Sequence, residues 1–496
     1  MSSLARVRSH ATLTASLRGL ALAALGLALA PAGAQAQEPS CVGDVDAVDV
    51  QQEPGPRLRF GIGPLVQAGQ VGPAPAPAVP EQPERTHAAL AALRPAAGPF
   101  VLRLNRFFWS DGEEGFQRYL ALVDRFTRLG YLIELQVRYH PNGSQEGDIP
   151  AWTRHVREVV RRFGANPRVI ALQIANEVNL TFSPDSSDGS YEGSRQALVD
   201  GVVAAKDEAR RNGLSHLEVG FNWAYRTDPA QEESFWRALR DRGGQEFVRA
   251  VDWIGLDAYP GTVFPPAESD LGGYRDGMVN AMSSMRCFAA IPGIPASVPM
   301  KIEENGWPTY PGRSQAMQAD VLREMVRAVH DYRGTYGVSD YRWFNLRDGD
   351  SSSPQLFQHF GLFDSAYREK PAFEIYRGLV SSLHRPEQAS PVPVRGGRPR
   401  IVLRLRYRAA RDRRGRRCAP GPVRATVRGR DIRFVRGIRF QVGSRKLRRI
   451  LVRRLPITRI AIRPRRIRAR RYRVRANLRL MDGQLLRLSR TFRGCR

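Results

Sequence analysis

Two segments of the chain carry carboxylates at the end of an apolar run. The first, Ile170–Glu177, ends in Asn176-Glu177, and the second, Lys301–Pro308, reads Lys-Ile-Glu-Glu-Asn-Gly-Trp-Pro. Two carboxyl groups that face one pocket can divide the work of catalysis. One stays protonated and donates a proton, and the other stays ionised and acts as a nucleophile. The two segments therefore indicate an active site with one carboxyl group from each, provided that the fold brings them together.

Strands and amphipathic helices alternate along most of the chain. Strands are predicted at Leu58–Ile62, Phe100–Arg106, Tyr131–Arg138, Val169–Asn176, Leu217–Trp223, Asp252–Tyr259, Met300–Glu304 and Tyr341–Leu346. Helices are predicted at Arg85–Leu93, Glu114–Leu129, Ala151–Phe163, Ser194–Arg211, Glu232–Arg242, Arg275–Ala290, Gln315–Tyr332 and Pro371–Leu383. Eight such units favour an α/β fold with a closed (β/α)8 TIM barrel. An open doubly wound sheet is the alternative, but the Gly-rich phosphate turn typical of that fold does not follow the first strand.

In a barrel of this kind, functional residues gather at the C-terminal ends of the strands. Asn176-Glu177 ends the fourth predicted strand, and Glu304 ends the seventh. Over roughly residues 55 to 384 the chain resembles the clan A glycoside hydrolases, retaining (β/α)8 enzymes that include the family 5 cellulases and mannanases. The resemblance implies that Glu177 is the acid/base and that Glu304, in Glu304-Asn305-Gly306-Trp307, is the nucleophile.

The register of the seventh strand decides between two neighbouring glutamates. Successive strand residues face opposite sides, so we expect only one of Glu303 and Glu304 to enter the barrel lumen, and the Glu-x-Gly-Trp-Pro spacing favours Glu304. Retention of configuration requires carboxyl groups ~5–5.5 Å apart, whereas inversion requires ~6.5–9.5 Å. The charge of the nucleophile is expected to raise the pKa of the acid.

Further residues near strand ends are candidates for substrate binding: Asn176, Tyr259, Trp343, Arg103, Asn105, His140 and Asn222. The resemblance implies that Asn176 binds a sugar hydroxyl and that Tyr259 lies beside the nucleophile. Trp343 is predicted to form a stacking floor for a pyranose, and the alternative is a tryptophan of the core. For His140, the alternative to substrate binding is a structural role. No His, Cys or Asp cluster has metal-ligand spacing and no phosphate loop is present, so neither a metal nor a cofactor is expected.

The net charge of +29 on 496 residues is unevenly distributed. Residues 391–496 contain 37 Lys and Arg against 3 Asp, a net charge of +34, which leaves −5 on the first 390 residues. Strict alternation over Arg471–Leu480, followed by Asp482-Gly483, predicts a β-hairpin, and a second hairpin is predicted at Gly443-Ser444. We therefore expect a small all-β, Ig-like sandwich whose exposed face is rich in arginine.

The N-terminus has the features of a secretory signal. Arg6, Arg8 and Arg18 precede an uncharged run, and Ala34-Gln35-Ala36 provides a cleavage site. Cleavage is expected after Ala36, or two residues earlier, and an uncleaved membrane anchor is the alternative. After cleavage no transmembrane segment is expected. The predicted organisation is a signal peptide at 1–36, a leader at 37–56, a catalytic barrel at 57–384, a Pro-rich linker at 385–400 and an Arg-rich β-sandwich at 401–496.

Four cysteines in an exported protein can form disulfides. Cys418 and Cys495 bracket most of the basic module and are the expected pair, which leaves Cys41 with Cys287. Four cysteines allow three connectivities, and spacing alone does not exclude the other two.

The sequence as a whole predicts a secreted retaining glycosidase that acts on a poly- or oligosaccharide. A non-catalytic carbohydrate- or surface-binding protein on the same scaffold is the alternative. The basic module suggests nucleic-acid binding, a plain arginine-rich sandwich, or adhesion to an anionic cell-wall polymer. Export argues against nucleic acid, so the expected partners are a carbohydrate and an anionic polymer.

Overall fold

The computed structural model describes residues 41–43, 45, 47, 50–65, 79–95, 98–263, 271–383, 401–429, 432, 435–442, 445–451, 458–462, 471–480 and 485–495. The predicted secretory signal and the linker at 385–400 lie outside these residues. So do Gly443-Ser444 and Asp482-Gly483, where the hairpin turns are predicted. Within the described ranges, no helix is both long enough and apolar enough to cross a membrane.

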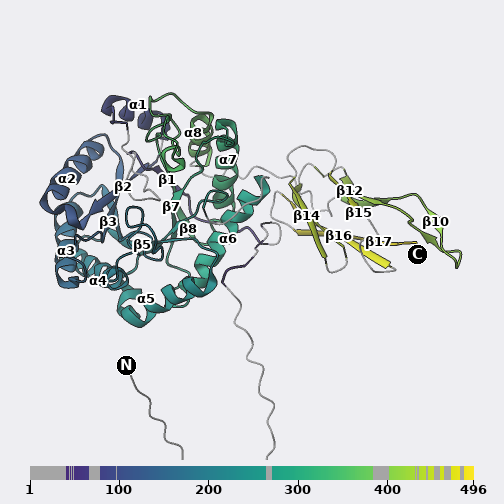
Figure 1. Cartoon of the computed structure of the whole chain (residues 1–496), viewed down its shortest axis with the longest axis horizontal. Coiled ribbons are helices and arrows are strands. Elements are labelled where there is room, and N and C mark those ends of the chain that lie inside the picture. Colours follow the sequence, from purple (N-terminus) through teal and green to yellow (C-terminus); the bar gives the residue numbers. More distant parts are fainter. Residues whose placement is uncertain are drawn as a thin grey trace, which may run out of the picture. The chain divides into compact units, whose positions relative to one another are not determined.

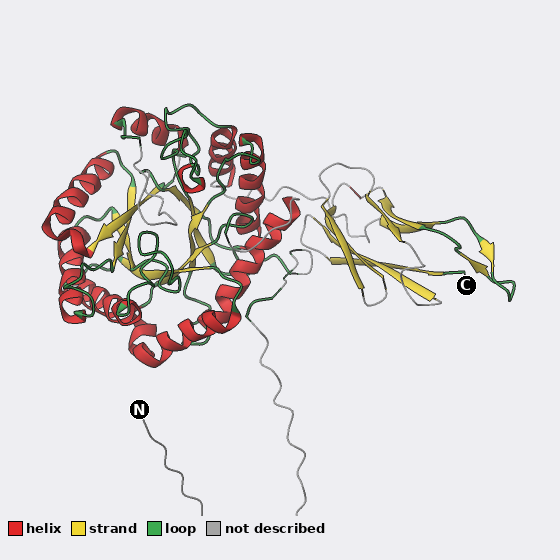
Figure 2. Ribbon diagram, in the orientation of Figure 1, coloured by secondary structure: helices red, strands yellow, loops and turns green. Residues whose placement is uncertain are grey.

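Eight parallel strands close into a barrel, and β1 pairs with β8 to complete it. The strands are β1 (Arg59–Ile62), β2 (Val101–Phe108), β3 (Leu132–Arg138), β4 (Val169–Ile174), β5 (Glu218–Ala224), β6 (Trp253–Asp257), β7 (Met300–Asn305) and β8 (Val338–Trp343). Helices surround them (Figures 1 and 2): α1 (Pro83–Leu93), α2 (Gly112–Arg128), α3 (Ile149–Gly164), α4 (Ser194–Arg211), α5 (Pro229–Ala250), α6 (Leu271–Ala289), α7 (Gln315–Tyr332) and α8 (Pro371–Leu383). The predicted TIM barrel is confirmed.

The helices form where the apolar spacing predicts them. On α2, the side chains of Phe116, Tyr119, Val123 and Phe126 are buried, which follows from their spacing of three and four residues. Helix α3 begins where the Asp148 side chain accepts a hydrogen bond from a backbone N–H in the first turn. Each helix thus covers the strands with one apolar face.

Charged side chains fill the part of the lumen nearest the N-terminal ends of the strands. The ion pairs there are Arg59–Glu218 (3.0 Å), Arg59–Asp340 (3.0 Å), Lys301–Glu218 (2.9 Å), Arg342–Asp340 (2.8 Å) and Arg342–Glu134 (3.2 Å). Burial acts to raise the pKa of Glu134, but Arg342, Lys301 and Arg103 hold it at about 2. Buried charges are tolerated in a fold only when they are paired in this way.

Two elements differ most from the predicted boundaries. Strand β8 begins at Val338 and ends at Trp343, whereas the sequence suggested residues 341–346. Asp340 interrupts the apolar pattern of β8 because the lumen it faces is charged. Element α5 extends beyond the predicted Arg242 because a second helical segment follows a kink at Gly244, whose φ of 48° is accessible to glycine without strain.

Two disulfides are present, Cys41–Cys287 and Cys418–Cys495. This is the connectivity favoured by the positions of the cysteines. The first bond joins the segment before β1 to helix α6, and the Tyr332 hydroxyl on α7 donates to the carbonyl oxygen of Ala47 in the same segment. The leader is therefore attached to the barrel by covalent and non-covalent contacts.

The C-terminal region consists of antiparallel sheets. Its strands are β9 (Ile401–Arg406), β10 (Ala410–Arg411), β11 (Arg417–Cys418), β12 (Val423–Gly429), β13 (Val435–Val442), β14 (Arg445–Leu451), β15 (Thr458–Ile462), β16 (Arg471–Leu480) and β17 (Leu485–Arg493). The sheet orders are β15-β12-β9 and β14-β13-β16-β17, with β10 and β11 as a separate pair. Apolar residues from the two larger sheets form one core. This confirms an all-β region after the barrel, and the finer Ig-like topology stays a prediction.

Candidate active site

A pocket lies at the C-terminal end of the barrel strands. Its lining includes a residue at or near the end of each of six strands: Asn105, Glu177, Ala224, Asp257, Glu304 and Phe344. The closed sheet brings these strand ends around one rim, so residues far apart in the sequence become neighbours. The predicted site therefore forms in three dimensions.

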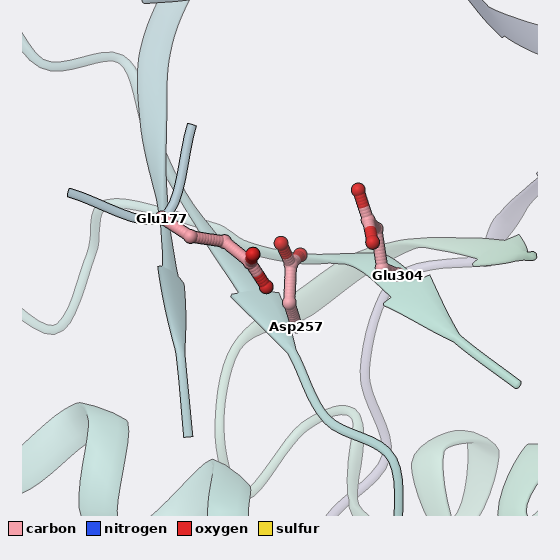
Figure 3. A group of neighbouring side chains, drawn as sticks. All are labelled: Glu177, Asp257 and Glu304. Atoms are coloured by element: carbon pink, nitrogen blue, oxygen red, sulfur yellow. The ribbon is translucent and has the colours of Figure 1, made fainter. Parts of the chain in front are cut away.

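Three buried carboxyl groups meet in this pocket. One carboxylate oxygen from each of Glu177, Asp257 and Glu304 lies within 4.8 Å of the other two. Figure 3 shows Asp257 between the two glutamates, with the carboxyl end of Glu177 directed toward it. The structure thus brings the two predicted catalytic glutamates together and adds a third acid that the sequence analysis did not select.

Glu304 is held at both of its carboxylate oxygens. Nη1 of Arg103 donates to Oε1 at 2.7 Å, and the Tyr259 hydroxyl donates to Oε2 at 2.6 Å. Burial and the charge of Glu304 raise the pKa of Tyr259 well above its usual value, so the hydroxyl remains a donor. These two donors, one of them cationic, fix the orientation of the Glu304 carboxyl group.

Glu177 lies just after β4 in a left-handed backbone conformation, with a φ of 44°. Its backbone N–H donates to Oδ1 of Asn222 at 2.8 Å, which anchors a conformation that a non-glycine residue rarely adopts. Burial first, and then the charge of Glu304, raises the pKa of Glu177 to about 8. A carboxyl group with this pKa is protonated at neutral pH and can donate a proton.

Asp257 is the last residue of β6 and is only 2 % exposed. It accepts a hydrogen bond from Nδ2 of Asn222. Burial and the charges of Glu304 and Glu177 raise the pKa of Asp257 well above its usual range. Burial and the charges of the two glutamates thus disfavour the ionised form of Asp257.

Two asparagines connect the acids on neighbouring strands. Asn176 lines the pocket, and its Oδ1 accepts hydrogen bonds from Gln136 at 2.7 Å and from Asn222 at 2.8 Å. Asn222 was predicted to bind substrate, but it is 2 % exposed and is not part of the pocket lining. Its hydrogen bonds to Asn176, Asp257 and Glu177 make it a positioning residue.

Arg103 also differs from its predicted role. Its side chain is 2 % exposed, lies outside the pocket lining, and contacts Glu304 at 2.7 Å and Glu303 at 3.4 Å. The carboxylates of the lumen hold the guanidinium behind the site, so Arg103 can affect a substrate only through the residues that it contacts, Glu304 among them. Asn105, two residues later, does line the pocket and accepts from Arg103 at 3.0 Å.

Trp343 does not form a stacking floor. It is fully buried in the barrel core and does not line the pocket. Asp340 and Arg342 point into the lumen, so strand alternation turns Trp343 toward the helices. Phe344, the next residue, lines the pocket instead.

His140 is displaced from the pocket lining as well. Its ring lies 4.3 Å from the ring of Phe108 and 5.6 Å from that of Tyr191, between centroids, and Nδ1 is 3.2 Å from the Ser110 hydroxyl. Burial lowers the pKa of this half-buried histidine. These contacts correspond to the structural alternative for His140.

The expectation that one glutamate of β7 faces away from the lumen is wrong. Both Glu303 and Glu304 contact Arg103, because the pairing of β7 with β6 and β8 shifts register at this point. Such a bulge places consecutive side chains on one side of a strand. Glu304 reaches the pocket, whereas Glu303 remains in the lumen, where burial and the charge of Glu134 raise its pKa well above the usual range.

The sequence contained a signal for Asp257 but not for the aromatic lining. Asp257 precedes Tyr259 by two residues, so strand periodicity predicts the same facing for both. Phe357 and Phe360, in contrast, line the pocket from the long segment after β8, whose path depends on tertiary contacts.

Among the described residues, the three pocket acids are also the group whose spacing could hold a cation, and Arg103 already places a positive charge against Glu304 there.

No protein-family model matches the chain, and no curated protein matches it. The chain is similar to the solved structure of GH5_18 from Bifidobacterium longum subsp. longum, with 14 % identity and a TM-score of 0.47 over 66 % of this chain and 79 % of that chain. It is similar to a β-glucosidase from Thermotoga maritima, with 13 % identity and a TM-score of 0.47 over 68 % of this chain and 100 % of that chain. A mutant of β-glucuronidase 2 from Bacteroides uniformis aligns at 13 % identity and a TM-score of 0.42, over 89 % of this chain and 46 % of that chain, so this chain spans less than half of its length. At such identities and scores these likenesses do not identify an activity.

Proposed function

We propose that the protein is a retaining glycoside hydrolase, with Glu177 as the acid/base and Glu304 as the nucleophile. The observation that carries the proposal is that carboxylate oxygens of these two buried residues lie within 4.8 Å of each other. Oxygens this close fit the ~5–5.5 Å of retaining enzymes better than the ~6.5–9.5 Å that inversion requires.

The two environments suit the two steps of a double displacement. In the first step, the oriented carboxylate of Glu304 attacks the anomeric carbon while Glu177 gives its proton to the departing oxygen, which leaves a glycosyl ester on Glu304. In the second step, Glu177 takes a proton from water, the water attacks the same carbon, and the ester bond breaks. Tyr259 and Arg103 hold Glu304 in position throughout.

Replacement of each glutamate tests the roles separately. Glu304→Ala removes the nucleophile, and azide then restores turnover only with an inverted product. Glu177→Ala most affects substrates with poor leaving groups, and azide rescues breakdown of the intermediate from an activated aryl glycoside with retained configuration. Glu233→Ala on α5, at an exposed glutamate paired with Arg237, is a matched control that should keep full activity.

A screen of the secreted protein against aryl glycosides and β-glucans identifies the sugar. If Glu304→Ala and Glu177→Ala leave all turnover unchanged, the proposal is wrong. Saccharide binding that both variants retain, without turnover in the wild type, supports a non-catalytic carbohydrate-binding protein. We also propose that the protein is exported, since its two disulfides fit an oxidising compartment.

We propose a second function, binding of an anionic polysaccharide, for the β-module. Its β9–β12 pairing places Arg406 directly opposite Arg424. Together with Arg417 and Tyr407, these arginines line a hollow on the module. Like charges on directly opposed strand residues are destabilising, and a polyanion that binds there relieves the repulsion. The ion pairs of Asp412 are with other arginines of the module.

Salt-dependent co-sedimentation with polygalacturonate tests this function. The triple variant Arg406→Ser, Arg417→Ser, Arg424→Ser should bind more weakly and with a smaller salt dependence. A charge-matched control removes three exposed arginines from helices of the barrel: Arg128→Ser, Arg154→Ser and Arg377→Ser. Equal losses in the two triple variants would show that only net charge matters. Tighter binding to duplex DNA than to polygalacturonate would favour the nucleic-acid alternative.

A further inference from the structure

The position of Glu177 defines which side of the pocket receives the leaving group. An acid/base protonates the oxygen that leaves, so the leaving group must lie on the Glu177 side. The wall on this side comes from the segment after Glu177 and from the ends of the neighbouring strands. Leu180 and Phe182 from that segment and Ala224 at the end of β5 contribute to it, and Val263, which follows β6, lines the same pocket.

This wall is apolar and open to solvent. Phe182 is 52 % exposed and Val263 is 40 % exposed, and both belong to the few large apolar side chains that are exposed in the described parts of the chain. Exposed apolar side chains grouped at the mouth of a pocket indicate a binding surface rather than chance exposure. A ligand that covers them removes apolar area from water.

Several polar groups beside the wall have partners within the protein. Asn179 donates from Nδ2 to the carbonyl oxygen of Ala224 at 2.8 Å and to Glu232 at 3.0 Å. The hydroxyl of Tyr225 is hydrogen-bonded to Ser284, and the guanidinium of Arg226 lies 5.6 Å above the ring of Phe182. A second sugar bound here would lose water from several hydroxyls and gain few hydrogen bonds, which is unfavourable.

The wall is also held in place before a ligand binds. Asp188 accepts hydrogen bonds from Arg138 Nε at 2.8 Å and from the backbone N–H groups of Tyr139 and Asn176 at 2.9 Å. A Cβ atom at position 189 would lie only 2.2 Å from the carbonyl oxygen of Leu180, so only glycine fits there. A pre-organised wall spares the ligand the cost of ordering it.

We propose that the preferred substrate is a glycoside with an apolar aglycone, an alkyl or aryl group, whose hydrocarbon part packs on Phe182 and Val263 while Glu177 protonates its oxygen. The proposal rests on the glycosidase function above and names its leaving group. It replaces the expectation of a poly- or oligosaccharide substrate with a small glycoside of an apolar alcohol.

A chain-length series tests the proposal. The probes are hexyl, octyl and decyl glycosides of the sugar that the enzyme cleaves, together with a disaccharide of that sugar. For the wild type we expect KM and the dissociation constant to fall about two- to fourfold per added methylene until the wall is covered. Phe182→Ser should raise KM for the octyl glycoside about five- to tenfold and KM for the disaccharide by a clearly smaller factor, whereas Phe182→Leu should restore most of the affinity.

The matched control is Leu129→Ser, at a side chain that is 40 % exposed at the end of α2 and does not line the pocket. It should change neither substrate. Equal affinity for all chain lengths, or a disaccharide preferred over the octyl glycoside, would overturn the proposal while turnover still supports a glycosidase. Chain-length-dependent binding by calorimetry with no turnover of any probe would instead support the apolar wall and contradict the catalytic function.

Discussion

The pKa of Glu177 should fall sharply when the charge of Glu304 is removed. At present burial and the charge of Glu304 raise this pKa to about 8. Wild-type kcat/KM should therefore be maintained at neutral pH and fall as the pH rises past about 8, because the acid loses its proton there. In Glu304→Gln the burial remains, but the repulsion between the two carboxylates does not.

The structure sets the size of this effect. The closest oxygens of Glu177 and Glu304 lie at most 4.8 Å apart. At this distance two unit charges repel each other by about 3.5 kcal/mol at an effective dielectric constant of about 20. Since one pKa unit corresponds to about 1.4 kcal/mol, Glu304→Gln should lower the pKa of Glu177 by about 2 to 2.5. Burial should still keep it above the value of a free glutamate.

Carbon-13 NMR on protein with labelled glutamate carboxyl groups measures this pKa directly. The Glu177 signal is assigned by its loss in Glu177→Gln. Glu303→Gln is the matched control, because burial and the charge of Glu134 raise the pKa of Glu303 and disfavour its charged form, so the substitution should shift the pKa of Glu177 little. A pKa that stays near 8 in Glu304→Gln would refute the reasoning and assign the whole effect to burial.

Three further substitutions test the supports of the site and of the module. Tyr259→Phe removes a hydrogen bond to Glu304 and should lower kcat about 10- to 100-fold with little change in Tm; an unchanged kcat would show that the hydroxyl does not support the nucleophile. Arg103→Met leaves buried carboxylates without their counter-charge and should cost about 3–5 kcal/mol in denaturant unfolding at neutral pH, a loss that should shrink in acid. Cys418→Ser frees Cys495 from a bond spanning 77 residues and should destabilise the module by about 4 kcal/mol, whereas reduction of the wild type should reproduce the same loss.

The sequence by itself determined the architecture of the barrel. Periodic apolar helices such as α2 and the eight alternations favoured a closed parallel sheet, because helices with one apolar face can cover every strand of such a sheet. The same periodicity placed Glu177 and Glu304 at strand ends, and a closed barrel necessarily turns those ends toward one pocket. These features depend on the local pattern of apolar and polar residues, which is visible in the sequence itself.

The tertiary structure decided the facing of individual side chains near the rim. The bulge in β7 turned both Glu303 and Glu304 inward, and the charged lumen around Asp340 placed Trp343 among the helices and Phe344 in the pocket. A single inserted residue reverses the facing of every later side chain of a strand. The local sequence does not specify which paired strand will produce such a bulge. The partnership of Asp257 with both glutamates likewise exists only once three strands converge, because the pKa of each acid depends on burial and on charges supplied by the others.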